Sequence, residues 1–229
     1  MDLYADKAPA LAQKLTTTAL ELAILALSGW ILFGPGGLLL AQIFHFAPPE
    51  GIPARRYVVF AFSVVVLARM AFTMFYLMHR RLPWAEAAFV PIAFAVYYVG
   101  FAVLVLPADA PIGPWDYFGI GLFVLGSVLN SGAELARDRF KKRPENKGRL
   151  YTEGLFGLSM HINFFGDVLW ITAYAILAHT LWAFIIPLLM LCFFAFYNVP
   201  MLDRYLAGHY GDQFTAYAGR TKRLIPFLW

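Results

Sequence analysis

Long apolar runs are the feature that most limits what this chain can fold into. A helix needs about 20 apolar residues to cross the hydrocarbon core of a bilayer. Charged residues make up only 14% of the chain, whereas soluble domains have about 25%. The runs that approach the required length stand at residues 15–33, 57–78, 85–106, 116–135, 155–178 and 181–200. The sequence therefore predicts an all-α integral membrane protein, in which residues 1–229 form a single domain with a bundle of six or seven transmembrane helices.

The segment 34–53, "GPGGLLLAQIFHFAPPEGIP", leaves the number of spans open. It is apolar but is interrupted by Gly and Pro at both ends, and a short helix at 38–46 would add a seventh span. With six spans, the basic loops and the C-terminal tail all fall on one side, which the positive-inside rule makes cytoplasmic, here at a bacterial inner membrane. Arg55 and Arg56 would then lie on the outer side, against that rule.

Several classes of protein find no support in the sequence. Cys192 is the single cysteine, so an intramolecular disulfide or a cysteine metal site is excluded. The five histidines lack zinc-ligand spacing, and no dinucleotide-binding glycine motif follows a strand. The basic segment 137–149 lies beside apolar spans, so we expect it to face anionic membrane lipids rather than nucleic acid. The expected small-molecule partner is lipid-like.

One polar face extends from the fourth span into its basic loop. Asn130, Glu134, Arg137 and Lys141 follow each other at intervals of three and four residues, so a helix places them on one face. An amide, a carboxylate and two cations in line can hold a polar, phosphorylated ligand. The alternative is a helix end whose charged side chains reach the membrane interface.

The next span contains a second polar pair. Asn163 and Asp167 are four residues apart and share a helix face, whereas His161 lies on a different face. Polar groups inside a membrane are costly, so they are candidates for function. The alternative is that they join neighbouring helices through hydrogen bonds.

A third group lies around the loop after the second span. Arg69, in the middle of that span, shares a face with Tyr76, and Glu86 opens the third span. These three residues are our candidates for contact with a substrate. Alternatively, Arg69 neutralises a buried carboxylate, either Glu21 or Asp167.

The stretch "GRLYTEGLFGLSMHINFFGD" and the ending "HYGDQFTAYAGRTKRLIPFLW" together resemble the steroid 5-alpha-reductase C-terminal-domain family. Sterol C14 reductases and, more distantly, isoprenylcysteine carboxyl methyltransferases share parts of this pattern. The resemblance is strongest over residues 125–229. It implies an all-α membrane bundle of six or seven spans whose cofactor, NADPH or S-adenosylmethionine, enters from the cytoplasmic side.

The resemblance also implies roles for individual residues. Asn130 and Glu134 match positions that contact the cofactor, and Asn163 and Asp167 match the Asn and Glu of the family's box. The basic side chains nearby would hold phosphates, and a tail tyrosine would lie near the cofactor. The implied cofactor-binding set is Asn130, Glu134, Arg137, Lys141, Arg149, Asn163, Asp167 and Tyr205. Met160 and Ile162 stand where the box has Arg and Pro.

Three functions follow as hypotheses. The first is an NADPH-dependent oxidoreductase that reduces an activated C=C bond of a lipid or steroid-like substrate, with Tyr76, Arg69 or Glu86 polarising the conjugated carbonyl. The seven cations of 137–149 favour NADPH because it carries several phosphates. The second is an S-adenosylmethionine-dependent membrane methyltransferase. The third is a non-catalytic lipid-binding membrane protein, suggested by the altered box.

Overall fold

The computed structural model describes residues 10–46 and 53–229, and within these ranges every regular element is helical. This confirms the predicted all-α fold class. Five continuous helical segments of the described chain are long and apolar enough to cross a membrane, and Ile162–Leu177 is a shorter apolar helix. The five are Leu11–Phe33, Ala54–Leu77, Trp84–Val105, Pro114–Lys142 and Leu181–Tyr210.

Several of these segments combine α-helices with π-helical turns. The α-helices are α1 (Leu11–Phe33), α2 (Gly36–Phe44), α3 (Ala54–Phe72), α4 (Trp84–Ala95), α5 (Phe101–Val105), α6 (Pro114–Lys142), α7 (Ile162–Leu177), α8 (Ile185–Phe193), α9 (Val199–Tyr210) and α10 (Asp212–Ala218). The π-helical turns Thr73–Leu77, Val96–Gly100 and Phe194–Asn198 extend α3, join α4 to α5 and join α8 to α9. Short 3₁₀ turns lie at Pro144–Asn146, Gly154–Gly157 and Leu181–Phe184.

The short helix expected at 38–46 is present as α2, but its nine residues extend only about 14 Å, less than half of a bilayer core. The fifth predicted span was wrong at its start, because α7 begins at Ile162 rather than near 155. The backbone N–H groups of Met160 and His161 donate to the carbonyls of Lys222 and Arg223 instead of joining a helix. The C-terminal tail therefore holds this segment, which consists of the 3₁₀ turn Gly154–Gly157 and further turns, outside the helix.

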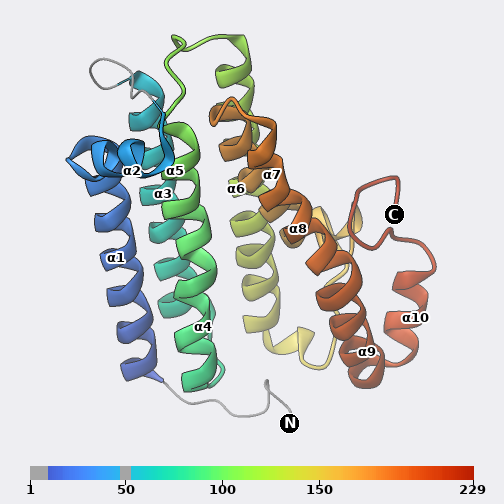
Figure 1. Ribbon diagram of the computed structural model, residues 1–229. Coiled ribbons are helices and arrows are strands. Elements are labelled where there is room, and N and C mark those ends of the chain that lie inside the picture. Colours follow the sequence, from blue (N-terminus) through green and yellow to red (C-terminus); the bar gives the residue numbers. More distant parts are fainter. Residues whose placement is uncertain (1–9, 47–52) are drawn as a thin grey trace. The chain divides into compact units, whose positions relative to one another are not determined.

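Two compact units account for the fold, and α6 and α7 each contribute to both. The first unit covers the described part of residues 1–119 together with 174–183. In it α1 packs against α3 and α4, as Figure 1 shows in blue and green. The fully buried Tyr174 stacks on Phe101, with 4.9 Å between ring centroids, and its hydroxyl lies 3.1 Å from that of Ser63. These aromatic contacts form the core of the unit.

The two arginines that conflicted with the positive-inside rule are buried in the first unit. Arg55 is 0% exposed and forms an ion pair of 2.9 Å with Asp116, which is equally buried. Arg56 donates to the carbonyls of Leu32 and Leu106, at 3.2 and 3.0 Å. Both guanidinium groups therefore satisfy backbone and carboxylate acceptors at helix ends. They are not free loop charges, so the loop-charge rule does not apply to them.

The second unit covers residues 120–173 and 184–229. Its α9 and α10 pack against each other after the turn at Gly211, which adopts a positive φ of 50° (Figure 1). Two small apolar clusters fill the unit. One is centred on Ala133, Phe156 and Ile162, and the other on Phe194, Val199 and Leu224.

Candidate functional site

A ladder of polar side chains joins α6 and α7 inside the second unit. The Asn130 amide donates to Asp167 Oδ1 at 2.9 Å and to the backbone carbonyl of Asn163 at 3.2 Å. One turn further along α6, Glu134 Oε1 accepts from the Asn163 amide at 2.8 Å. We call these four residues the polar ladder. The i, i+4 spacing within each helix supplies two residues on one face, and the packing of the helices brings the two faces together.

Two glycines allow this close approach. A Cβ on Gly166 would lie 2.7 Å from the backbone N of Asn130 and from the carbonyl O of Gly126. A Cβ on Gly126 would likewise lie 2.5 Å from the carbonyl O of Gly166. Small residues at a helix crossing let membrane helices pack with their backbones nearly in contact. At this separation even short Asn and Asp side chains reach across the interface.

The polar ladder ends in a pair of opposite charges. Glu134 Oε2 accepts from the Arg137 guanidinium, three residues further along α6. The Glu134 side chain is 18% exposed and that of Arg137 is 42% exposed. Arg137 also lies over the ring of Phe156, 5.6 Å from its centroid. The pair is therefore accessible to a ligand, whereas Asn163 is buried.

The other cations predicted to hold phosphates have protein partners. Lys141 Nζ donates to the hydroxyl of Tyr210 at 2.7 Å, and Arg149 donates to the side-chain oxygen of Asn146 at 3.1 Å. Tyr205, the predicted tail tyrosine, stacks on His209. The structure thus joins four of the eight predicted cofactor residues in the polar ladder and adds Arg137 through Glu134. Their role in binding a cofactor stays a prediction.

The tail fastens the segment that precedes α7. Ser159 donates to the carbonyl of Leu224 at 2.8 Å, and His161 Nε2 lies 2.8 Å from Asp203 Oδ1. The Tyr217 hydroxyl donates to the carbonyl of Phe156 at 2.6 Å. Burial raises the pKa of Tyr217 above its usual range, because the phenolate would lose its hydration. His161 thus bonds to α9 and has its own partner outside the polar ladder, although it lies before the start of α7 and not on a face of that helix.

The three predicted substrate residues lie in the first unit, on α3, on the π-helical turn that extends it and in the first turn of α4. Glu86 accepts from Arg80 Nη1 at 2.8 Å, so its carboxylate is already paired. Tyr76 is 48% exposed and stacks on Phe72. Arg69 lies in the last turn of α3. The role of these three residues in substrate contact stays a prediction.

The sequence analysis named Glu21 only as a possible partner of Arg69, and it missed the buried Tyr98 in the same unit. Glu21 and Tyr98 are both 0% exposed, and neither the Glu21 carboxyl oxygens nor the Tyr98 hydroxyl has a hydrogen-bond partner in the described part of the chain. No hydrogen bond therefore joins Arg69 to the Glu21 carboxyl group. A carboxyl in the middle of the first span was the available signal, because such groups inside a membrane usually serve a function.

Two known proteins have sequences similar to part of this chain. The chain is 33% identical over 93 residues to a probable O-methyltransferase, ustE, from Ustilaginoidea virens, covering 40% of this chain and 33% of that protein. It is 27% identical over 117 residues to protein-S-isoprenylcysteine O-methyltransferase B from Arabidopsis thaliana, covering 48% of this chain and 59% of that protein. The matches therefore span from a third to about three fifths of these relatives.

A family profile matches residues 84–221, which is more than half of the 229 residues. The matched region contains the whole polar ladder, the basic segment and most of the tail. The chain belongs to the family described as "Protein of unknown function (DUF1295)", within the steroid 5-alpha-reductase C-terminal-like superfamily.

Proposed function

We propose that this protein is a membrane-embedded O-methyltransferase that uses S-adenosylmethionine and acts on a lipid-like small molecule. The observation that carries the proposal is the accessible Glu134–Arg137 pair at the end of the polar ladder. The two relatives support it, because both have names that describe O-methyltransferases.

The charge pair suits the amino-acid end of S-adenosylmethionine, which has one ammonium and one carboxylate group. Glu134 would accept from the ammonium, and Arg137 would donate to the carboxylate. A carboxylate has about four lone-pair sites and a guanidinium has five N–H donors. Asn163 and Arg137 each use one site on Glu134, so acceptor capacity remains for a ligand. The donor set therefore fits this cofactor without rearrangement of the polar ladder.

When bound, the cofactor would supply an electrophilic methyl group to a nucleophilic oxygen of the substrate. The contribution of the chain is to position that group. The Asn163 amide holds Glu134 at 2.8 Å, and Asn130 ties α6 to α7 through Asp167. A carboxylate held in this way loses little conformational freedom when the ligand binds.

An NADPH-dependent reductase is the second candidate, and the basic segment 137–149 is the observation that favours it. NADPH would require several cations to bind phosphate. Lys141 and Arg149 already donate to protein acceptors, and Lys142 forms an ion pair of 2.7 Å with Asp138. These three cations would each have to exchange a protein partner for a phosphate oxygen. We therefore rank the reductase second. The oxidoreductase activity and the substrate roles of Tyr76, Arg69 and Glu86 belong to this second hypothesis.

The test is a ligand titration of the purified full-length protein in detergent. S-adenosylhomocysteine and NADPH are titrated separately, and thermal unfolding is followed by intrinsic tryptophan fluorescence. We expect saturable stabilisation by S-adenosylhomocysteine. Glu134→Gln is expected to weaken binding at least about tenfold, because it removes a charge-assisted hydrogen bond.

Lys142→Gln is the matched control, since Lys142 lies on the same helix and its side chain is 48% exposed. This variant should bind S-adenosylhomocysteine like the wild type. Stabilisation by NADPH alone would reverse the order of the two candidates. Stabilisation by neither ligand would instead support the non-catalytic, lipid-binding hypothesis.

A further inference from the structure

The first unit contains an apolar cavity of about 460 Å³. This volume lies within the usual range of small-molecule sites. Its walls come from the end of α2, the segment around the end of α5 and the turn that follows α7. Of the described residues that line it, only two have polar side chains, His179 and Thr180. The apolar part of the wall includes Phe44, Leu104, Pro107 and Trp182.

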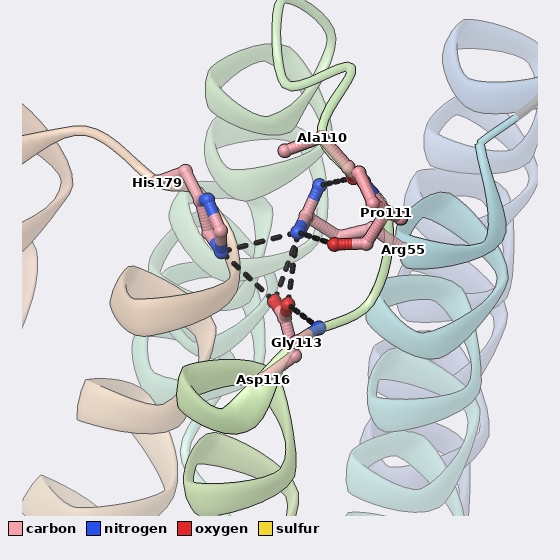
Figure 2. Close-up of polar contacts among 6 residues, drawn as sticks. All are labelled: Arg55, Ala110, Pro111, Gly113, Asp116 and His179. Atoms are coloured by element: carbon pink, nitrogen blue, oxygen red, sulfur yellow. Dashed lines mark hydrogen bonds and ion pairs between the residues drawn. The ribbon is translucent and has the colours of Figure 1, made fainter.

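His179 belongs to a buried polar network, which Figure 2 shows. Asp116 Oδ1 lies 3.0 Å from both Arg55 Nε and His179 Nε2. Asp116 Oδ2 accepts from Arg55 Nη2 at 2.9 Å and from the Gly113 backbone N–H at 2.8 Å. Four nitrogen atoms thus surround the two oxygens of the Asp116 carboxylate. A carboxylate has about four lone-pair sites in total, so each nitrogen can have one of them.

Nε2 of His179 lies 3.0 Å from Asp116 Oδ1 and 3.1 Å from Arg55 Nη2. The contact with the carboxylate favours a proton on Nε2, because an unprotonated Nε2 would direct its lone pair at the fully buried Asp116 Oδ1, which is repulsive. With a proton on Nε2, the histidine donates to Asp116, and Arg55 Nη2 can direct its two protons to Asp116 and to the Pro111 carbonyl. The neutral ring then has a lone pair on Nδ1. Within the described chain, no group forms a hydrogen bond with that atom.

We propose that this cavity binds a neutral single-chain lipid alcohol, whose hydroxyl group donates to Nδ1 of His179 and whose hydrocarbon chain fills the apolar walls. None of these residues belongs to the polar ladder, so the proposal does not depend on the methyltransferase function.

The charges around the cavity favour a neutral head group. Asp116 already compensates the positive charge of Arg55, and both side chains are 0% exposed. Among the described residues, a carboxylate or phosphate head would therefore meet no free cation there, and it would lose its hydration. A hydroxyl group needs only one acceptor, and Nδ1 of His179 provides it.

Photolabelling with a diazirine-bearing dodecanol tests this site. The full-length protein is placed in phosphatidylcholine nanodiscs, labelled, digested and analysed by mass spectrometry. Unlabelled dodecanol, dodecanoate and dodecane serve as competitors. We expect labels on the peptides that contain residues 103–108 or 178–182, and we expect dodecanol to compete at about fivefold lower concentration than dodecane or dodecanoate, as one net hydrogen bond predicts.

Three variants refine the result. His179→Phe should label but lose the preference for the alcohol, whereas Thr180→Val, at the neighbouring wall position, should keep it. Leu104→Trp should fill the cavity and suppress the labelling. If dodecane competes with the wild type as well as dodecanol does, the cavity accepts any bilayer chain and the proposal is wrong. Preferential competition by dodecanoate would also overturn it. The wild-type comparison decides the question even if a variant fails to fold.

Discussion

Removal of the Asp116 carboxylate is expected to be the most damaging single change in the first unit. In Asp116→Leu, the buried Arg55 guanidinium would lose the acceptor of two hydrogen bonds, and His179 and Gly113 would each lose one. Breaking a buried ion pair while one charge stays in place costs about 3–5 kcal/mol. In a chain of this size, that corresponds to a fall of about 6–20 °C in the unfolding temperature.

The assay is thermal unfolding of the detergent-solubilised protein, followed by the fluorescence of its six tryptophans. The double variant Arg55→Met/Asp116→Leu should unfold at a higher temperature than Asp116→Leu alone, because it leaves no uncompensated charge. Lys142→Gln removes the half-exposed lysine from its pair with the 10% exposed Asp138, and it should change stability by less than Asp116→Leu does. If Asp116→Leu unfolds within about 2 °C of the wild type, the buried pair does not stabilise the unit and the reasoning fails.

Two further predictions concern the second unit. Gly166→Ala places a Cβ 2.7 Å from the backbone of Asn130, so we expect a loss of about 1–3 kcal/mol from overpacking; Gly121→Ala meets open space and should be neutral or slightly stabilising in the same melting assay. Burial raises the pKa of Tyr217. The stability that the protonated Tyr217 hydroxyl contributes is therefore complete below the unfolded-state pKa of about 10, and it is lost as the pH rises through the higher folded-state pKa. Wild-type stability should therefore decline above about pH 10. Tyr217→Phe should flatten that decline and should lower the unfolding temperature at neutral pH. If the wild type and the variant unfold at the same temperature at neutral pH, the hydroxyl group does not stabilise the protein.

Properties that depend on a single helix, such as its length and the residues that share one of its faces, could be predicted from the sequence. Apolar runs of membrane-spanning length predicted the helical class and most of the spans. The i, i+4 spacing predicted that Asn130 and Glu134 share one face, and that Asn163 and Asp167 share another. The start of α7 could not be predicted in this way, because the segment before Ile162 is held outside the helix by hydrogen bonds to a tail about 60 residues away, rather than by its local composition.

The loop-charge rule illustrates the same limit. It treats arginines as free charges that select a side of the membrane, and on that basis Arg55 and Arg56 appeared misplaced. In the structure both are buried and bonded to acceptors at least 24 residues away in the chain. Sequence alone contains no sign of these partners, because each lies on a different element.

The sequence by itself thus determined that this protein is a helical membrane protein, and it determined which polar residues share a helix face. The tertiary structure decided which faces meet. Contact between Gly126 and Gly166 brings Asn130 to Asp167, and the packing of the first unit brings Arg55 to Asp116, which lies 61 residues further along the chain. The physical reason is that helical periodicity follows from local backbone geometry, whereas the pairing of polar groups depends on how closely distant segments pack.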